Sequence, residues 1–512
     1  MTSKIGDREV DSTRIAANAI LMMLSKAISH GCFLLIAVVL ARSLTRDDFG
    51  TFNQVWLVNK SLLYLFALGL PVSVYYFLPR LPQMKIKGFI LQTLISLTIL
   101  ALPFSISMYA LGDWLAVHFN NPGLTYYLRL FAIYPLIMLP TVSTDAILIG
   151  LGRTKHAALF EIVSKTAMVG AVAAAGILEQ RLDLVFKALI AYAVAQSLLA
   201  IWMVWWPLRG IKFRFSVAEW KKQLAYSAPY GMATLAGALN DQVDKILIAL
   251  FYPPAIFALY AAGAFEIPLA GVTSVPVVSV IMGGLTKKFT AGDIEGFLQL
   301  WHQSMLKLAL PVFAVAAFLM VFAEPIIVGL FSSDYADSVW PFRIFLLLLP
   351  LRITVPWQVL ASLGETKFVF KAMIAAMTVN IILGYTMIQS IGWFGPAMAA
   401  AFTGYLFSAL IMVEIRNRLS VNLGRLVPWR LLARVGLIAI VAAACSAAVP
   451  FLSINPLWKL GAGLVVFATV YLIGNVKIKA ITLDDLQLLW HSALTVPESL
   501  TRKQVLGNGT HR

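Results

Sequence analysis

Apolar residues along the chain are gathered into blocks of roughly 20, and short polar segments separate the blocks. At 1.5 Å per residue, a helix of that length crosses the roughly 30 Å hydrocarbon core of a bilayer. The pattern therefore predicts an all-α polytopic membrane protein with about fourteen transmembrane helices. The predicted spans lie near residues 15–41, 50–78, 88–111, 124–150, 157–178, 184–206, 224–251, 256–285, 302–323, 339–363, 368–390, 393–415, 431–450 and 457–475.

The polar connections between these spans alternate in basic content. One set is rich in lysine and arginine, whereas the other holds Arg42, Arg46 and Arg181 and then almost none. Because cytoplasmic loops carry the excess of Lys and Arg, the first set and both chain termini are predicted to be cytoplasmic. The first set consists of Lys4, Arg8, Arg14, Arg80, Lys85, Lys87, Arg153, Lys155, Arg209, Lys212, Arg214, Lys221, Lys222, Lys287, Lys288, Lys367, Lys371, Arg416, Arg418, Arg425 and Arg430.

Composition agrees with this topology and excludes several classes of protein. Of the 512 residues, 60% are hydrophobic and 12% are charged, whereas a soluble chain is about a quarter charged. The net charge of +16 follows the basic loops and favours contact with anionic lipid. No basic surface domain is present to bind nucleic acid. Cys32 and Cys445 both lie in apolar spans, so no disulfide framework is expected.

A repeated motif relates the two halves of the chain. The sequence LGRTK at 151–155 recurs as LGETK at 363–367, an offset of 212 residues. This offset spans six predicted helices, so both halves have the same orientation, as in transporters with parallel repeats and a substrate site between them. The predicted division is a cytoplasmic N-terminus (1–14), a first six-helix bundle (15–206), an amphipathic cytoplasmic linker (207–223), a second six-helix bundle (224–418), two additional spans (431–475) and a cytoplasmic tail (476–512).

Charged and amide side chains interrupt the seventh predicted span. Asn240, Asp241, Asp244 and Lys245 fall within six consecutive positions of this span. A charge near the bilayer centre costs roughly 3 kcal/mol on insertion scales, so these groups require a paired or wetted environment. The spacing of Asn240 to Asp244 and of Asp241 to Lys245 is i,i+4, which places the pairs on one side of a continuous helix. Two interpretations stay open: Asp241 and Lys245 neutralise each other, or this face lines a cavity that binds an ion or a substrate.

Short motifs occur in a definite order over residues 10–475. They are Leu-Thr-x-x-x-Phe-Gly-x-Phe at 44–52, Asp-Lys-Ile-Leu-Ile at 244–248, Ala-Leu-Tyr-Ala-Ala-Gly at 258–263 and the repeated Leu-Gly-x-Thr-Lys. With six, six and two predicted spans around them, the chain resembles the multidrug/oligosaccharidyl-lipid/polysaccharide exporter superfamily, and within it the polysaccharide branch that includes the Wzx-type flippases. The resemblance implies two pseudo-symmetric six-helix bundles in a V around a central cavity, followed by two C-terminal helices.

The same resemblance implies a function. It is that of a flippase, not an enzyme, which moves undecaprenyl-pyrophosphate-linked oligosaccharide from the cytoplasmic to the outer leaflet of a bacterial inner membrane by alternating access. The product would serve cell-surface polysaccharide biosynthesis. The implied partners are the lipid-linked glycan, membrane lipid and the polysaccharide polymerase and ligase machinery. No cofactor or metal is implied, and one chain would contain the whole site, so a functional monomer is expected.

A pyrophosphate group requires cationic side chains along its path. In the family, the first, second, seventh and eighth helices line the cavity, which makes Lys26, Lys60 and Lys245 the leading substrate-binding candidates. Arg343 and Arg80 are the next candidates. Weaker ones are Arg129, Lys165, Arg352 and Lys371.

Intramembrane carboxylates are the candidates for ion coupling. Asp244, Asp241 and Glu266 lie on the seventh and eighth predicted helices, and Asn240 lies beside them. Desolvation favours a neutral carboxyl group, so one of them is a candidate proton carrier. Asn240 and a carboxylate also offer the oxygen ligands that hard cations prefer. Coupling to H⁺ and coupling to Na⁺ both stay open. Weaker candidates are Asp145 and Glu161.

Other functions are compatible with parts of this pattern. A cation-coupled multidrug antiporter would favour a cavity of carboxylates and aromatic rings, whereas this chain carries lysines and arginines in its spans. A lipid II flippase also needs a cationic cavity and stays open. A membrane glycosyltransferase or polymerase would need a sizeable loop with catalytic groups, but the loops opposite the basic ones are short and nearly uncharged. No P-loop, His/Glu zinc pattern or nucleophile elbow occurs in the sequence.

Overall fold

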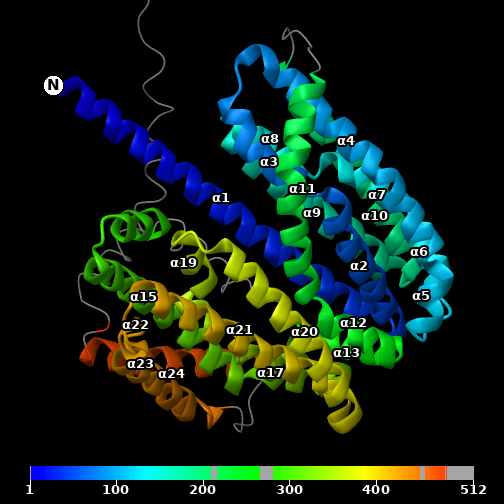
Figure 1. Cartoon of the computed structure of the whole chain (residues 1–512). Helices are drawn as coiled ribbons and strands as arrows, with labels where there is room; N and C mark the ends of the chain where they lie inside the picture. Colours follow the sequence, from blue (N-terminus) through cyan, green and yellow to red (C-terminus); the bar gives the residue numbers. More distant parts are fainter. Residues whose placement is uncertain (1, 209–215, 266–280, 450–455, 479, 481–512) are drawn as a thin grey trace, which may run out of the picture.

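The computed structural model describes residues 2–208, 216–265, 281–449, 456–478 and 480, which form helices and no strand (Figure 1). The all-α class is therefore confirmed. By length and hydropathy, 10 described helical segments qualify as membrane spans, or 11 if the bent pair at 46–80 counts as one. The predicted count of about fourteen is not reached by this criterion. One qualifying segment, 366–419, holds two helices, and the predicted span 224–251 is divided in two.

Several spans of the first bundle are broken. Residues 46–80 bend by 44° at Leu68 and Gly69, which both have positive φ, and the predicted span 124–150 is interrupted near Pro140. The helices are α1 (Thr2–Ser43), α2 (Arg46–Ala67), α3 (Leu70–Phe77), η1 (Leu78–Arg80), α4 (Gln83–Ala110), α5 (Gly112–His118), α6 (Leu124–Phe131), α7 (Ile133–Met138), η2 (Leu139–Thr141), α8 (Thr144–Gly150), α9 (Thr154–Glu179), α10 (Leu182–Trp205) and η3 (Trp206–Leu208).

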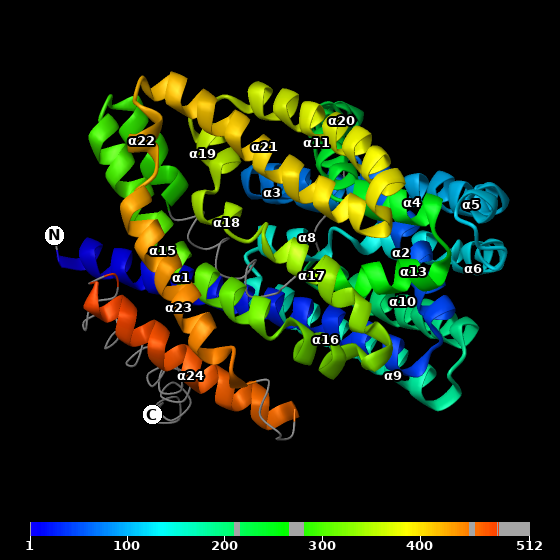
Figure 2. The same cartoon turned by 90° about the horizontal axis from the view of Figure 1, so that it is seen from below.

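The second bundle is followed by a helical hairpin. The hairpin consists of α23 and α24, and α23 packs along α15 (Figure 2). The helices are α11 (Val217–Asn240), α12 (Val243–Phe251), α13 (Pro254–Gly263), α15 (Ile294–Val321), α16 (Ala323–Phe331), η4 (Ser333–Ser338), α17 (Val339–Leu346), α18 (Leu351–Thr354), α19 (Pro356–Ser362), α20 (Thr366–Ile391), η5 (Gly392–Phe394), α21 (Gly395–Leu419), α22 (Leu423–Leu426), α23 (Trp429–Ser446) and α24 (Pro456–Lys477). Residues 281–290 are also helical.

The two copies of the repeated motif adopt the same turn. Gly152 and Gly364 have φ angles of +73° and +88°, a region that glycine occupies without the steric cost of a Cβ atom. Each turn leads into a 26-residue helix, α9 or α20. The shared residues thus specify the same reversal of the chain at corresponding positions of the two bundles.

Helix α11 belongs to the second half of the sequence but packs on the first bundle. It begins at Val217, inside the segment predicted to be a linker, and contacts α2, α3 and α4. Gln223, which is fully buried, donates to the hydroxyls of Ser73 and Thr93 at 2.9 Å each. Its carbonyl oxygen accepts from Gln92 at 3.1 Å. Because buried polar groups are costly to leave unpaired, this network fixes α11 to the first bundle.

Apart from α11, the two bundles touch at the end of the molecule opposite the basic loops. We call this the closed end; it comprises residues 42–50, 119–123, 250–254 and 329–338. There Gly50 of α2 lies directly against the backbone of Pro254, where α13 begins. The polar contacts across the closed end run from Arg42 to the carbonyl groups of Gly329 and Leu330, from Arg46 to Asp334 (3.7 Å) and from Asn120 to the Leu250 carbonyl (3.1 Å).

Candidate functional site

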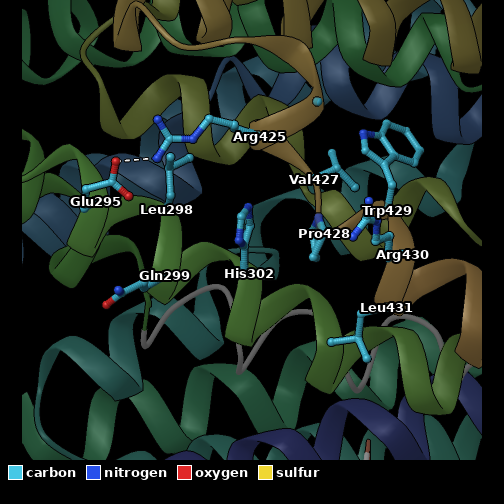
Figure 3. Close-up of a pocket in the computed structure, with 11 residues that line it drawn as sticks. Glu295, Leu298, Gln299, His302, Arg425, Val427, Pro428, Trp429, Arg430 and Leu431 are labelled. Atoms are coloured by element: carbon cyan, nitrogen blue, oxygen red, sulfur yellow. Dashed lines mark hydrogen bonds and ion pairs between the residues drawn. The ribbon is translucent and has the colours of Figure 1, made fainter. Parts of the chain in front are cut away.

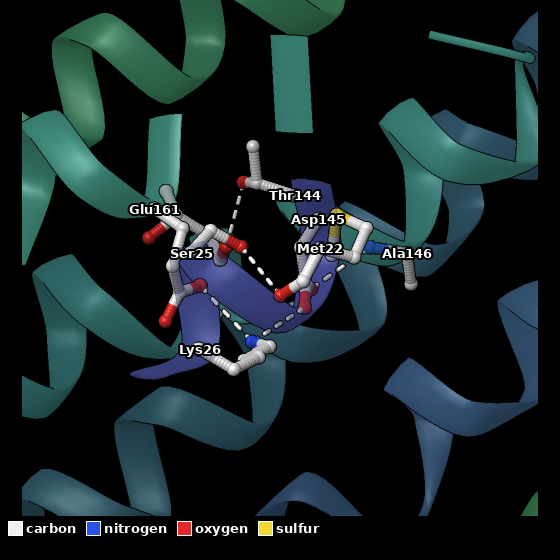
Figure 4. Close-up of polar contacts among 8 residues, drawn as sticks. Met22, Ser25, Lys26, Thr144, Asp145, Ala146 and Glu161 are labelled. Atoms are coloured by element: carbon white, nitrogen blue, oxygen red, sulfur yellow. Dashed lines mark hydrogen bonds and ion pairs between the residues drawn. The ribbon is translucent and has the colours of Figure 1, made fainter. Parts of the chain in front are cut away.

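Lys26 lies between two carboxylates of the first bundle (Figure 4). Its Nζ atom is 3.1 Å from Oε2 of Glu161 on α9 and 3.7 Å from Oδ2 of Asp145 on α8. The Lys26 side chain is 46% exposed, whereas that of Glu161 is 12% exposed. The charge of this predicted substrate-binding lysine is therefore balanced inside the protein, by two residues that the sequence ranked only as weak coupling candidates.

Two further side chains complete this charge cluster. Lys165, one helical turn beyond Glu161, places its Nζ atom 5.2 Å from the centre of the Phe33 ring. Tyr75 of α3 lies close enough to interact with the Asp145 carboxylate. The N-lobe cluster, defined here as Lys26, Tyr75, Asp145, Glu161 and Lys165, thus holds two cations and two anions. It joins α1, α3, α8 and α9, all of them helices of the first bundle.

The predicted seventh span breaks where its polar residues occur. Helix α11 ends at Asn240 and α12 begins at Val243, so the expected continuous helix with i,i+4 polar stripes is wrong at this point. Lys245 places its Nζ atom 3.8 Å from Asp244 and 3.5 Å from the carbonyl oxygen of Asp241. The lysine is therefore paired with Asp244, its neighbour in sequence.

Asp244 is the buried member of this group. It is 3% exposed, and its carboxylate accepts a hydrogen bond of 2.8 Å from the hydroxyl of Tyr260, itself fully buried. Tyr260 was not predicted as a site residue, although it lies in the Ala-Leu-Tyr-Ala-Ala-Gly motif. The Asn240 side-chain oxygen is buried without a hydrogen-bond partner among the described residues, and Asp241 is exposed. Glu266 lies outside the described residues.

Lys60 differs from the other two leading lysines. It is half-buried in α2, eight residues before the bend at Leu68. Among the residues that the structure describes, none forms an ion pair or a hydrogen bond with it. Lys60 is thus a cation in a membrane helix without a described counter-charge.

The two leading arginine candidates, Arg80 and Arg343, both have partners within the protein. Arg80 is exposed at the end of η1, donates to the carbonyl oxygen of Tyr76 and lies 4.2 Å from the centre of that ring. Arg343 of α17 donates from Nε to the carbonyl oxygen of Met320 at 3.3 Å and faces the ring of Trp340. The five cationic candidates therefore lie on five separate elements. No group of three or more His, Cys, Asp or Glu residues suited to a metal ion occurs in the described part of the chain.

The N-lobe cluster yields a prediction about stability. Replacing Glu161 with glutamine leaves Lys26 and Lys165 with one carboxylate, so we expect the free energy of unfolding to fall by about 1–3 kcal/mol. Adding Lys26→Met removes the unbalanced charge and is expected to restore much of the loss. Thermal unfolding of the two single variants and the double variant in one detergent measures this coupling. Strictly additive losses would show that the two groups do not interact.

The sequence of this chain is similar to those of known proteins. A family described as polysaccharide biosynthesis protein matches residues 15–281, more than half of the chain. An uncharacterized membrane protein of Methanocaldococcus jannaschii is 21% identical over 79% of this chain and 99% of its own length.

Solved structures show the same fold. The lipid II flippase MurJ, in an inward closed conformation, has a TM-score of 0.71 and 14% identity, over 90% of this chain and 98% of its own. An inward-facing multidrug resistance transporter of the MATE family has a TM-score of 0.62 and 16% identity, over 78% and 98%. The chain therefore shares the fold of these two transporters, and by the match over residues 15–281 it belongs to the polysaccharide biosynthesis protein family.

Proposed function

We propose that this chain translocates a polyprenyl-pyrophosphate-linked oligosaccharide between the leaflets of a bacterial inner membrane. Family membership and fold support a multi-pass flippase or exporter, and the charges in its helices support this particular cargo. The sugar-pyrophosphate head is too polar for hydrocarbon, so it needs a wet, cationic path while the lipid tail stays in the bilayer. No bond is made or broken in this process, and the chain is proposed not to be an enzyme.

Lys60 is the observation that carries the proposal. An ionised side chain within a membrane helix is expensive unless a partner compensates it, and no described residue does so for Lys60. A diphosphate group would supply the missing negative charge and accept hydrogen bonds from the ammonium group. Lys26 and Lys245 differ because carboxylates already lie within 4 Å of them.

Contacts at the closed end support alternating access from the basic side. Arg46–Asp334 and Arg42–Leu330 join the bundles at that end, so substrate would enter from the end with the basic loops. The positive-inside rule assigns those loops, and both termini, to the cytoplasm. We propose Asp244 as the residue through which H⁺ or Na⁺ couples to the cycle, and a single chain as the functional unit.

A lipid II flippase is the second candidate. The structural match to MurJ covers 90% of this chain, whereas the match to the MATE transporter covers 78%. Lipid II shares the polyprenyl-pyrophosphate anchor, so the same cations would serve. Flipping of lipid II and of a polyprenyl-pyrophosphate oligosaccharide, compared in parallel proteoliposomes, separates the two candidates by rate.

We expect Lys60→Ala to slow flipping of the polyprenyl-pyrophosphate oligosaccharide by about 10- to 100-fold, since a hydrogen bond to a charged group contributes about 1.5–3 kcal/mol. Lys60→Arg keeps the charge and should retain more of the rate. The assay follows accessibility of a labelled head group in proteoliposomes. A multidrug antiporter is indicated instead if the wild-type chain moves no lipid-linked sugar but extrudes organic cations.

Lys187→Ala is the matched control for charge. Lys187 lies in α10 and pairs with Asp183 at 3.0 Å, far in sequence from the proposed path. Its removal lowers the net charge by the same amount and should leave flipping near the wild-type rate. Equal losses in Lys60→Ala and Lys187→Ala would mean that overall charge, not a pyrophosphate contact at Lys60, controls transport.

A further inference from the structure

A cavity of about 530 Å³ lies apart from the charge groups described above (Figure 3). It is formed by one face of α15, by α22 and by the first turn of α23. The membrane-spanning segments of α15 and α23 begin at Ile294 and Trp429, so the cavity lies where spans emerge from the hydrocarbon. This is the depth at which phospholipid head groups lie.

Basic side chains line this cavity from both sides. Arg425 of α22 is paired with Glu295 of α15, whereas Arg430 of α23 has no ion pair with a described residue. His302 stands at the centre, and its Nε2 atom is held 3.1 Å from the carbonyl oxygen of Leu426. The lining therefore offers a guanidinium without a described counter-charge and a fixed imidazole, which suits an anion with several acceptor oxygens.

Most of the remaining lining is apolar or aromatic, with Gln299 as a polar exception. Leu298, Val427 and Leu431 contribute aliphatic surface, and Trp429 is exposed at the rim. Tryptophan is enriched at the membrane interface because its ring is apolar and its N–H is polar. Beyond the cavity, α23 continues with exposed apolar side chains such as Leu437 and Ile440. A ligand here thus meets positive charge at its head and a lipid-facing helix along its tail.

We propose that this cavity binds the phosphate diester head group of an anionic phospholipid, with Arg430 as its principal contact. Basic pockets between helices at a membrane surface bind such head groups. The lipid would bridge α15 of the second bundle to the α23–α24 hairpin. The site is separate from the proposed path of the transported glycan, and the proposal does not depend on which glycan is moved.

Two variants test the site by different means. Arg430→Gln removes the charge and keeps most of the side-chain length. Gly424→Leu fills the cavity, because Gly424 lines it and a Cβ atom there meets no other atom within 4 Å. The matched control is Arg434→Gln, one turn further along α23 and outside the cavity lining. Native mass spectrometry of the full chain in neutral detergent measures bound phosphatidylglycerol against phosphatidylcholine with the same acyl chains.

We expect the wild-type chain to retain phosphatidylglycerol in preference to phosphatidylcholine. Arg430→Gln and Gly424→Leu should each weaken phosphatidylglycerol binding by about fivefold or more, the effect of one favourable charge contact near a membrane surface. Arg434→Gln should bind like the wild type. Equal weakening in Arg430→Gln and Arg434→Gln overturns the proposal in favour of general surface attraction. Displacement of phosphatidylglycerol by glycerol 3-phosphate overturns the lipid as occupant and indicates a soluble phosphate ester.

Discussion

Replacing Asp244 with asparagine is expected to remove the dependence of transport on an ion gradient and to lower the free energy of unfolding by about 3 kcal/mol. Asparagine has nearly the same shape, and its carbonyl oxygen accepts the hydrogen bond of Tyr260. It carries no charge, however, so Lys245 loses the carboxylate 3.8 Å away. Gradient-driven flipping in proteoliposomes, with separate pH and Na⁺ gradients, measures the first effect and identifies the ion.

A second variant separates coupling from folding. Asp244→Asn with Lys245→Met restores charge balance and should recover most of the lost stability, but not the response to a gradient. Asp241→Asn makes the same chemical change at an exposed position three residues earlier and should have the smaller effect. If the double variant regains both stability and gradient response, Asp244 is a structural partner of Lys245 and not the coupling residue.

Replacing Gly50 with alanine is expected to disrupt the closed end and to slow transport about 10- to 100-fold, as overpacking of a tight contact costs roughly 1–3 kcal/mol. A Cβ atom at Gly50 would overlap the carbonyl group of Pro254 and lie 2.9 Å from its Cα atom. Backbone atoms of α13 cannot rotate away as a side chain can. In Gly50→Ala the two bundles would have to move apart at this point, whereas the proposed alternating access requires this end to close in each cycle.

Gly170→Ala is the control for this prediction. Gly170 lies inside α9, and a Cβ atom there meets no other atom within 4 Å. Alanine favours a helix over glycine by roughly 0.5–1 kcal/mol, so this variant should be as stable as the wild type or more stable.

Closure itself is measured by cross-linking Arg46→Cys to Asp334→Cys with a short bifunctional reagent, in a chain whose Cys32 and Cys445 are replaced by alanine. The cross-link should form efficiently in the chain that also carries Gly170→Ala and poorly in the chain that also carries Gly50→Ala. Equal yields would show that the contact between Gly50 and Pro254 does not control the closed end.

The sequence alone determined the class of this protein. Long apolar blocks identify membrane helices because the length and hydrophobicity that a membrane span needs are properties of a single segment. The repeated Leu-Gly-x-Thr-Lys predicted a shared turn, and both glycines have the positive φ that such a turn requires. The order of the motifs indicated the polysaccharide branch of the exporters, and the match over 15–281 confirmed a polysaccharide biosynthesis protein family. Each of these signals is local, so no knowledge of the packing was needed.

Only the tertiary structure decided which charged groups meet. The sequence showed that Lys26, Lys60 and Lys245 each need compensation in a membrane, but the partner of Lys26 is Glu161, 135 positions away. The expected continuous helix is interrupted, because α11 ends at Asn240 and α12 begins at Val243, and the carboxylate of Asp244 lies 3.8 Å from Lys245. An unpaired charge is costly inside a membrane, so the sequence alone shows that a partner is needed. Which residue is that partner depends on how the helices pack.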